Sequence, residues 1–374
     1  MDELTAWLLL LRAPSLDVEK LSLLLEKFGK ASAALQAGAT AWRELELAPR
    51  TCSFLNTAAI DSVAVDRAWL EQPGHHLVSF DSIDYPPLLR HLSDAPLGLF
   101  VKGNPQLLRS PQLAIVGSRN PTPYGREIAE SFAKHLTNCG LTITSGLAAG
   151  IDAASHRGAL AGNSMTIAVC GTGLDIIYPR SSDTLAREIA ARGALVSEFP
   201  PGTPPRKANF PQRNRIISGM SLGTLVVEAT LQSGSLITAR LAGDQGREVF
   251  AIPGSIHNPM AKGCHQLIRQ GAKLVDSAKD ILCELGPLAA VTPHLSQPDT
   301  ANLPDSLAFL EPQLDKEYKI LLDALGFEPL GVDQLVMRSG LKADAVASML
   351  LMLELEGRIA SFPGGLYVQA GFGK

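Results

Sequence analysis

Aromatic residues and cysteines are scarce in this sequence, and it contains no long apolar run. Its 374 residues include 5% aromatics and five cysteines, no two of them in the C-x-x-C spacing of zinc or redox pairs. The longest uninterrupted apolar run covers residues 6–11, well short of the roughly 20 residues that cross a bilayer. We therefore expect a cytoplasmic protein with no transmembrane helix and no metal site built from cysteines.

Common nucleotide-binding motifs are also missing. Gly171-Thr172-Gly173 lacks the third glycine of the dinucleotide fingerprint G-x-G-x-x-G. The phosphate loop G-x-x-x-x-G-K-[ST] does not occur anywhere in the sequence. These absences argue against dinucleotide redox chemistry and against ATP hydrolysis.

The net charge excludes one class of protein, and the distribution of charge singles out one part of the chain. The formal net charge of −4 argues against a general polyanion binder of the histone type. Residues 199–227 nevertheless contain Arg206, Lys207, Arg213 and Arg215 and no acidic residue. A polyanion that binds this chain is therefore expected to meet its middle part.

Composition and periodicity divide the chain into four segments. Residues 1–74 contain short helical patterns broken at glycine and proline, and predict an all-helical accessory module. Residues 77–285 alternate apolar runs with amphipathic helices, which predicts an α/β, Rossmann-like doubly wound sheet with its ligand site at the carboxyl ends of the strands. The predicted strands are 113–116, 141–144, 166–169, 194–197, 224–227 and 249–252.

The rest of the chain predicts a linker and a small C-terminal module. Residues 286–312 contain five prolines and little periodicity, as flexible linkers do. Residues 313–374 predict three helices and a β-hairpin, the elements of a winged-helix module. Its third helix, 343–356, has no Lys or Arg, so contact with a protein is favoured over contact with duplex DNA.

Loops of small residues follow the first three predicted strands, at 117–120, 145–152 and 170–173. Glycine lets a ligand approach the backbone closely, Ser118 offers a hydroxyl, and Arg119 offers a bidentate guanidinium. A tight turn requires glycine whatever it binds, so one such loop is weak evidence. Three on the same edge of the sheet favour a ligand that carries phosphate.

The segment 206–219 combines cations with amides and one aromatic ring. Lys207 and the neighbouring arginines suit the phosphates of single-stranded nucleic acid, while Phe210 suits stacking of a base, worth roughly 1–3 kcal/mol. The alternative is that Phe210 belongs to the core and that the arginines form a solvated face. We favour nucleic acid because Arg119 is expected at the same edge of the sheet.

Asp152 and His156 lie four residues apart, on one face of a predicted helix. Such a pair can ligate a metal ion. A helix-capping aspartate and a hydrogen-bonded histidine are favoured instead, because no third ligand is spaced nearby.

Short motifs follow one another in a distinctive order along the middle of the chain. They are Gly117-Ser118-Arg119, Ser145-Gly146, Gly150-Ile151-Asp152 with His156, Gly171-Thr172-Gly173 with Tyr178-Pro179, residues 210–218, Glu228-Ala229, Ser233-Gly234-Ser235 and Ile252-Pro253-Gly254. In this order they resemble the DNA processing protein A (DprA/Smf) family over about residues 80–285. The flanking modules resemble the helical, SAM-like N-terminal domain and the winged-helix C-terminal domain that many members carry.

The resemblance implies a bacterial protein that is not an enzyme and has no cofactor. It would bind single-stranded DNA, shield it, and help to load the RecA recombinase on it during natural transformation. The implied DNA contacts are Gly117, Ser118, Arg119, Lys207, Asn209, Phe210, Arg213, Asn214 and Arg215.

The resemblance also implies a homodimer formed through the end of the sheet domain. His265 and Leu274 would lie at the dimer interface, with Arg269 nearby as a RecA contact. Leu267 and Ile268, like Leu274, are equally compatible with an ordinary core.

An enzyme that acts on a nucleotide is the alternative, since the predicted sheet also resembles that of lysine-decarboxylase-like nucleotide phosphoribohydrolases. Their P-G-G-x-G-T-x-x-E motif is absent here. Ser233-Gly234-Ser235 follows the fifth predicted strand instead, and Glu228 comes one position too late after Gly223-Thr224. A similar sheet alone is an analogy of fold, so we favour the binding protein.

Overall fold

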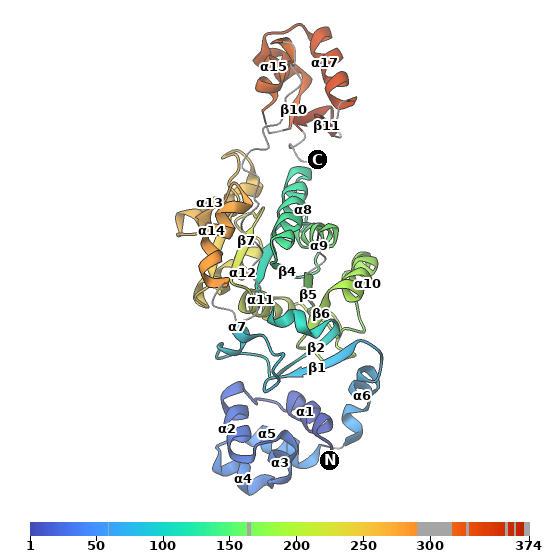
Figure 1. Ribbon diagram of the computed structural model, residues 1–374, viewed down its shortest axis with the longest axis vertical. Helices are drawn as coiled ribbons and strands as arrows, with labels where there is room; N and C mark the ends of the chain where they lie inside the picture. The colour runs from blue at the N-terminus through green and yellow to red at the C-terminus, as the bar shows by residue number, and fades with distance from the viewer. Residues whose placement is uncertain are drawn as a thin grey trace. The chain divides into compact units, whose positions relative to one another are not determined.

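The computed structural model of the chain describes seven stretches of residues, which fall into two compact units, Met1–Ser296 and Gln297–Lys374 (Figure 1). No helix in these stretches is long and apolar enough to span a membrane. From residue 290 onward the predicted linker lies outside them, and its first residues, 286–289, end helix α14 (Ala278–Ala289). The described stretches are 1–58, 60–162, 166–289, 316–326, 329–355, 358–362 and 364–369.

The described residues up to Leu70 are helical, as the sequence predicts. An ion pair ties the first of these helices to the last, because the Arg12 guanidinium donates two 2.8 Å hydrogen bonds to the buried Asp66 carboxylate. Asp2 caps the first helix by accepting from the Thr5 N–H at 2.7 Å. The helices are α1 (Glu3–Arg12), α2 (Val18–Phe28), α3 (Ala31–Gln36), α4 (Gly38–Glu44), α5 (Pro49–Thr57), the 3-10 helix η1 (Ile60–Val63) and α6 (Ala64–Leu70).

A nine-stranded sheet forms the centre of the first unit (Figure 1). Its strands are β1 (His75–Ser79), β2 (Gly98–Gly103), β3 (Gln112–Val116), β4 (Thr142–Ser145), β5 (Thr166–Val169), β6 (Ala194–Ser197), β7 (Gly223–Val226), β8 (Glu248–Ala251) and β9 (Lys273–Leu274). They lie in the order β1-β2-β6-β5-β4-β3-β7-β8-β9. Strands β3 to β9 pair in parallel, and β1 and β2 extend the β6 edge in antiparallel fashion.

The parallel strands β3 to β7 are buried on both faces, which explains why apolar runs locate them. In β3, Leu113 and Ile115 pack into the core on one face of the sheet, while Ala114 and Val116 pack into the core on the other. All six predicted strands are confirmed to within one residue at either end. The doubly wound prediction is likewise confirmed.

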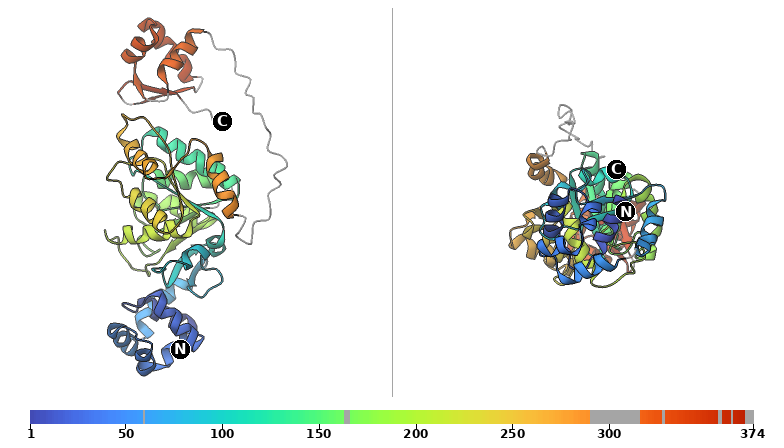
Figure 2. Two further views of the ribbon diagram at one scale, coloured as in Figure 1. Left: turned by 90° about the vertical axis from the view of Figure 1, so that its left-hand side faces the viewer. Right: turned by 90° about the horizontal axis from the view of Figure 1, so that it is seen from below.

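Helices cover both faces of this sheet (Figures 1 and 2). One face packs against α7 (Pro87–Arg90), α11 (Asn209–Met220), α12 (Ser235–Asp244) and α13 (Lys262–Arg269). The other face packs against α8 (Pro123–Asn138), α9 (Ile151–Ala161), α10 (Asp183–Arg192) and α14.

The outer strands β1, β2 and β9 are not among those predicted from the sequence. His75, in β1, is buried by stacking on the Trp69 ring at a centroid distance of 4.0 Å, and its Nδ1 contacts the Trp69 carbonyl at 2.8 Å. Both β9 residues are exposed. The polar side chains of β1 and the exposed side chains of β9 thus conceal these two strands from a search for apolar runs. Strand β2 differs, because its buried run Leu99-Phe100-Val101 is apolar and is a signal from which it could have been predicted.

The second unit has the winged-helix elements that the sequence predicts. Its helices are α15 (Lys316–Leu325), α16 (Val332–Ser339) and α17 (Ala343–Leu355), and its three-stranded sheet has the order β10 (Leu330–Gly331), β12 (Leu366–Gln369), β11 (Ile359–Phe362). Leu321, Leu335 and Leu350 meet in one core from the three helices.

Gly158 provides a test of the packing between α8 and α9. A Cβ at this position would lie 2.1 Å from the Glu130 carbonyl oxygen, which belongs to the α8 backbone and has no flexible end to move. We expect Gly158→Ala to lower the free energy of unfolding by about 1–3 kcal/mol. Gly243→Ala in α12 is the matched control: nothing lies within 4 Å of its Cβ position, so it should raise stability by up to ~1 kcal/mol. Urea unfolding measures both, and equal midpoints would refute the close helix crossing.

Candidate nucleic-acid interface

A cavity of about 850 Å³ opens at the carboxyl ends of β3 and β7. These strands are neighbours, yet the sheet continues from β3 to β4 on one side and from β7 to β8 on the other. Such a switch point leaves a crevice between the loops of an open parallel sheet, and ligands of these folds bind there. Seven of the nine predicted DNA contacts line the cavity: Gly117, Ser118, Arg119, Lys207, Phe210, Arg213 and Asn214.

The loop after β3 is held tightly on both sides. Its Ser118 N–H donates to the Glu228 carbonyl at 2.7 Å, and its Ser118 carbonyl accepts from the Ile151 N–H at 3.1 Å. A Cβ at Gly117 would lie 2.6 Å from the Ile151 side chain, so glycine is required by packing here. The loop is therefore a rigid wall from which the exposed Arg119 projects.

An aromatic and cationic cluster lies at the mouth of the cavity. The Arg119 guanidinium is 6.0 Å from the centroid of the Phe210 ring, and the Tyr178 ring is 5.5 Å from it. Phe210 is only half-buried and lines the cavity, so it is not an ordinary core residue. Gly171 leaves room for this ring, because a Cβ there would stand 3.0 Å from Phe210 Cδ1.

The residues that line the cavity include three cations and one acid. Lys207 and Arg119 are exposed, whereas Arg213 is 4% exposed and donates from Nη1 to the Val169 carbonyl at 2.8 Å. Burial lowers the pKa of Arg213, an effect that the Asp152 charge partly offsets. Because guanidinium does not lose its proton in proteins, Arg213 places a positive charge in the floor of the cavity.

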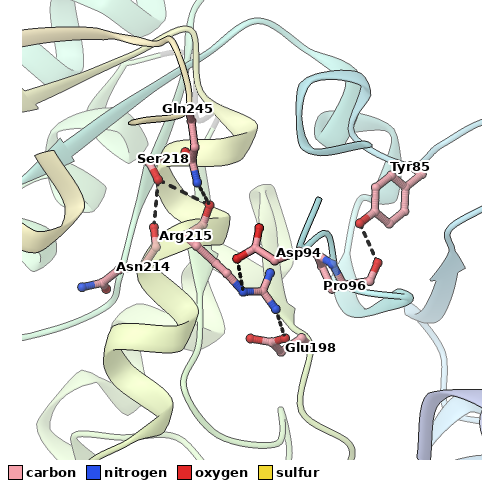
Figure 3. Close-up of polar contacts among 8 residues, drawn as sticks. All are labelled: Tyr85, Asp94, Pro96, Glu198, Asn214, Arg215, Ser218 and Gln245. Carbon is pink, nitrogen blue, oxygen red and sulfur yellow. Dashed lines mark hydrogen bonds and ion pairs between the residues drawn. The ribbon is translucent and has the colours of Figure 1, made fainter. Parts of the chain in front are cut away.

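Two of the predicted DNA contacts do not line the cavity. Asn209 is buried and donates from Nδ2 to the Gly171 carbonyl at 3.0 Å, which ties the start of α11 to the loop after β5. Arg215 extends toward two acids, neither of which lines the cavity (Figure 3). Its Nη2 lies 2.5 Å from Glu198 Oε2, and its Nε lies 3.6 Å from Asp94 Oδ2.

Several polar residues on the other wall were not singled out as DNA contacts. Thr230, Ser233, Ser235 and Thr238 line the cavity from the segment that leads from β7 into α12. Their signal in the sequence is the Ser-Gly-Ser motif after the fifth predicted strand. Tyr178 also has a signal in the sequence, because it lies in the loop that follows the third predicted strand.

Asp152 and His156 are hydrogen-bonded within the protein, as favoured over a metal pair. The Asp152 carboxylate accepts from the Gly146 and Ala148 N–H groups at 3.2 and 3.4 Å, and burial raises its pKa. His156 Nδ1 lies 2.8 Å from the Thr166 hydroxyl, which itself donates to the Ile143 carbonyl. Nδ1 is therefore the protonated nitrogen of a neutral imidazole.

The residues expected at a dimer interface differ in their exposure. Leu274 is 49% exposed on β9, at the edge of the sheet, whereas Leu267 and Ile268 pack against the core. His265 Nε2 contacts the Gly254 carbonyl at 2.9 Å, and Arg269 is exposed at the end of α13.

Comparisons with known proteins agree with this arrangement. Residues 76–286 match the family described as DNA recombination-mediator protein A, and residues 306–365 match the DprA winged helix domain. Protein Smf of Escherichia coli (strain K12) is 47% identical over 307 residues, which cover 81% of this chain and 80% of that protein. DNA processing protein DprA of Bacillus subtilis (strain 168) is 47% identical over 219 residues, 58% of this chain and 73% of that protein.

Two solved structures share the fold. DNA processing protein A from Streptococcus pneumoniae superposes with a TM-score of 0.65 at 38% identity, covering 74% of this chain and 95% of that one. DNA processing protein A from Helicobacter pylori, whose structure was described for its single-stranded DNA binding mode, gives a TM-score of 0.52 at 30% identity. This second match covers 57% of this chain and 96% of the other.

The buried His156 predicts a dependence of stability on pH. Burial lowers its pKa from 6.5 to about 3, so within this window the unfolded chain binds a proton that the folded protein does not. Stability should therefore fall as the pH drops from 6.5 toward 3, by up to about 1.4 kcal/mol per pH unit from this residue. In urea unfolding at pH 7 and 5, His156→Gln should reduce the difference between the two pH values. The exposed His135→Gln should leave it unchanged, and equal pH dependence in both variants would contradict the assignment.

Proposed function

Because this chain belongs to the DNA recombination-mediator protein A family, we propose that it binds single-stranded DNA in the cavity at the carboxyl ends of β3 and β7. The observation that carries the proposal is the cluster of Arg119, Phe210 and Tyr178 at the mouth of the cavity, with the exposed Lys207 on the same lining. Cations that follow phosphates and rings that stack on bases are the two elements of single-strand binding sites. The related Helicobacter pylori protein supports the assignment.

Each residue of the cavity has a distinct part in this proposal. Arg119 and Lys207, both exposed, pair with phosphates, and Phe210 with Tyr178 receives a base. Gly117 and Ser118 form the rigid wall along which the strand lies. The remaining lining residues, Arg213 and Asn214, supply a buried positive charge and an amide inside the cavity. Asn209 and Arg215 do not line the cavity: Asn209 ties the start of α11 to the loop after β5, and Arg215 pairs with Glu198.

Binding is a better description of the cavity than catalysis. Asp152 is the one acid among its lining residues, and its carboxylate is engaged by two backbone N–H groups. The sequence contains a G-x-S-x-G spacing at 219–223, but it runs from a helix into a strand, opposite to a nucleophile elbow. Its Ser221 is fully buried and donates to the Ile217 carbonyl. The phosphoribohydrolase alternative therefore gains no support.

The wider role that we propose is that of the family: shielding single-stranded DNA in the cytoplasm and helping to load RecA on it during natural transformation. A homodimer suits this role, because two linked sites on one strand bind with avidity. The half-exposed Leu274 on the edge strand β9, with His265 near it in the chain, supports a dimer surface there. The exposed Arg269 supports a RecA contact close to that surface.

Salt dependence of DNA binding tests the cavity. In anisotropy titrations of a labelled oligothymidylate, log K should fall with log salt at about −0.7 per phosphate contact. Arg119→Ala and Lys207→Ala should each weaken binding and remove about 0.7 from this slope. Phe210→Ala should cost about 1–3 kcal/mol of binding free energy and leave the slope unchanged, because a ring displaces no counterion.

Arg187→Ala is the matched control for these titrations. Arg187 is an exposed arginine of α10 whose partner is Asp183, and it does not line the cavity. It should keep the affinity and the slope of the wild type. Weak binding that none of the cavity variants changes would refute the proposal, and a screen of nucleoside monophosphates would be the next step.

The dimer surface is tested separately. Leu274→Arg places a charge at the sheet edge, so light scattering at increasing concentration should show a monomer where the wild type shows a dimer. Ile83→Arg is the control, because Ile83 is 77% exposed in the segment after β1. A dimer that survives Leu274→Arg would place the interface elsewhere.

A further inference from the structure

We infer that Arg215 and Glu198 form a largely buried ion pair that positions the cation-bearing loop 199–208 and the start of α11, so that Arg215 serves DNA binding without touching DNA. This inference rests on the proposed function of the cavity. It assigns a positioning role to Glu198, an acid that no sequence motif marks, and changes the role expected for Arg215.

Helix geometry separates Arg215 from the residues that line the cavity. Arg213 and Asn214 line it, and each further residue of a helix turns by about 100°. The Arg215 side chain consequently leaves α11 about 100° from Asn214 and about 200° from Arg213. There it is 13% exposed, and the Glu198 side chain is 10% exposed. Figure 3 shows the guanidinium between Glu198 and Asp94, and neither of its acids lines the cavity.

Because of the position of Glu198 in the chain, the ion pair holds both ends of the segment that carries the proposed DNA contacts. Glu198 follows β6 directly, and Arg215 lies 17 residues further on in α11. Between them the chain carries Lys207 and Phe210, two of the proposed DNA contacts. The ion pair thus fixes both ends of the segment that presents them.

Arg215 is itself held from a second direction. Its carbonyl accepts from Gln245 Nε2 at 3.2 Å, and Asp94 approaches its Nε. Four residues along the helix, Gly219 lies against the segment that carries Asp94, since a Cβ there would be 2.7 Å from Leu92 Cδ1. Glu198 is therefore bound to a part of α11 that cannot shift easily.

A buried ion pair is sensitive to the loss of one partner. Burial raises the pKa of Glu198, and the charge of Arg215 partly offsets this effect. Removing Arg215 leaves the Glu198 carboxylate without its charged partner, and removing Glu198 leaves Arg215 with only the more distant and exposed Asp94. Replacing both with apolar side chains of similar size removes the unpaired charge. Single and double variants therefore distinguish a positioning role of Arg215 from direct contact between Arg215 and a phosphate.

The first experiment measures the loop without DNA. Arg206 and Lys207 are exposed, so trypsin reports how readily the loop enters its active site. We expect Glu198→Gln and Arg215→Met to speed cleavage after Lys207 about tenfold, and Arg215→Met/Glu198→Leu to return it to within about threefold of the wild type. The control is Glu130→Gln, which removes an exposed carboxylate paired with Arg157 and should leave the rate unchanged.

The second experiment measures oligothymidylate binding by the same variants. Both single variants should weaken it about tenfold, and the double variant should recover it to within about threefold. If Arg215 instead contacts a phosphate, Glu198→Gln should leave DNA binding unchanged or make it tighter. Arg215→Met alone should then flatten the salt slope by about 0.7. Either this reverse pattern or a wild-type cleavage rate in Glu198→Gln would overturn the inference.

The two experiments separate this inference from the proposed function. If the wild type fails to bind DNA, the proposed function falls. Trypsin cleavage still decides whether the ion pair holds the loop, and a wild-type cleavage rate in Glu198→Gln refutes that role. Thermal unfolding of every variant confirms that the compared proteins are folded. Where a single variant is not folded, the double variant is compared with the wild type instead.

Discussion

Glu228 makes the contact on which the cavity depends. It is buried two residues beyond β7, and its backbone carbonyl accepts from the Ser118 N–H while its carboxylate accepts from the Thr122 N–H and hydroxyl at 2.8 and 2.6 Å. A buried carboxylate requires such donors to offset the loss of water. One residue thereby joins the end of β7, the loop after β3 and the N-terminal cap of α8. Gly125 completes the arrangement, because a Cβ there would lie 2.5 Å from the carboxyl carbon.

Helix α11 divides its two sides between different tasks. Phe210, Arg213 and Asn214 line the cavity, while Arg215 forms the buried pair with Glu198 and Gly219 lies against Leu92. The same short segment of sequence therefore supplies both ligand-facing groups and the contacts that hold them. This arrangement places the cavity on rigid elements, which limits the conformational entropy that binding costs.

Local charge, and not the net charge, suits the cavity to a polyanion. The whole chain is acidic by four charges, yet Arg119, Lys207 and Arg213 line the cavity against Asp152 alone. The three cations are not equivalent. Arg119 and Lys207 are exposed and free to follow a flexible strand, whereas Arg213 is fixed by the Val169 carbonyl and by the close approach of Gly146. Arg213 is buried, and a buried charge is screened less by salt than one in solvent.

The sequence by itself determined six of the parallel strands, the edge of the sheet where the cavity opens and seven of the residues that line it. A strand that is buried on both faces has an uninterrupted run of apolar residues, so the sequence reveals it. In a parallel sheet the loops that follow the strands all lie at the same edge. Tertiary structure alone decided the strands β1 and β9, which have polar or exposed side chains, and the separation of Arg215 from the cavity. It also decided that Asn209 bonds to the Gly171 carbonyl and that Phe210 is left half-buried. These outcomes depend on residues that are distant in the chain, such as Glu198 and Asp94 for Arg215. A local sequence pattern indicates whether a residue is buried, but it does not identify the residue that it contacts.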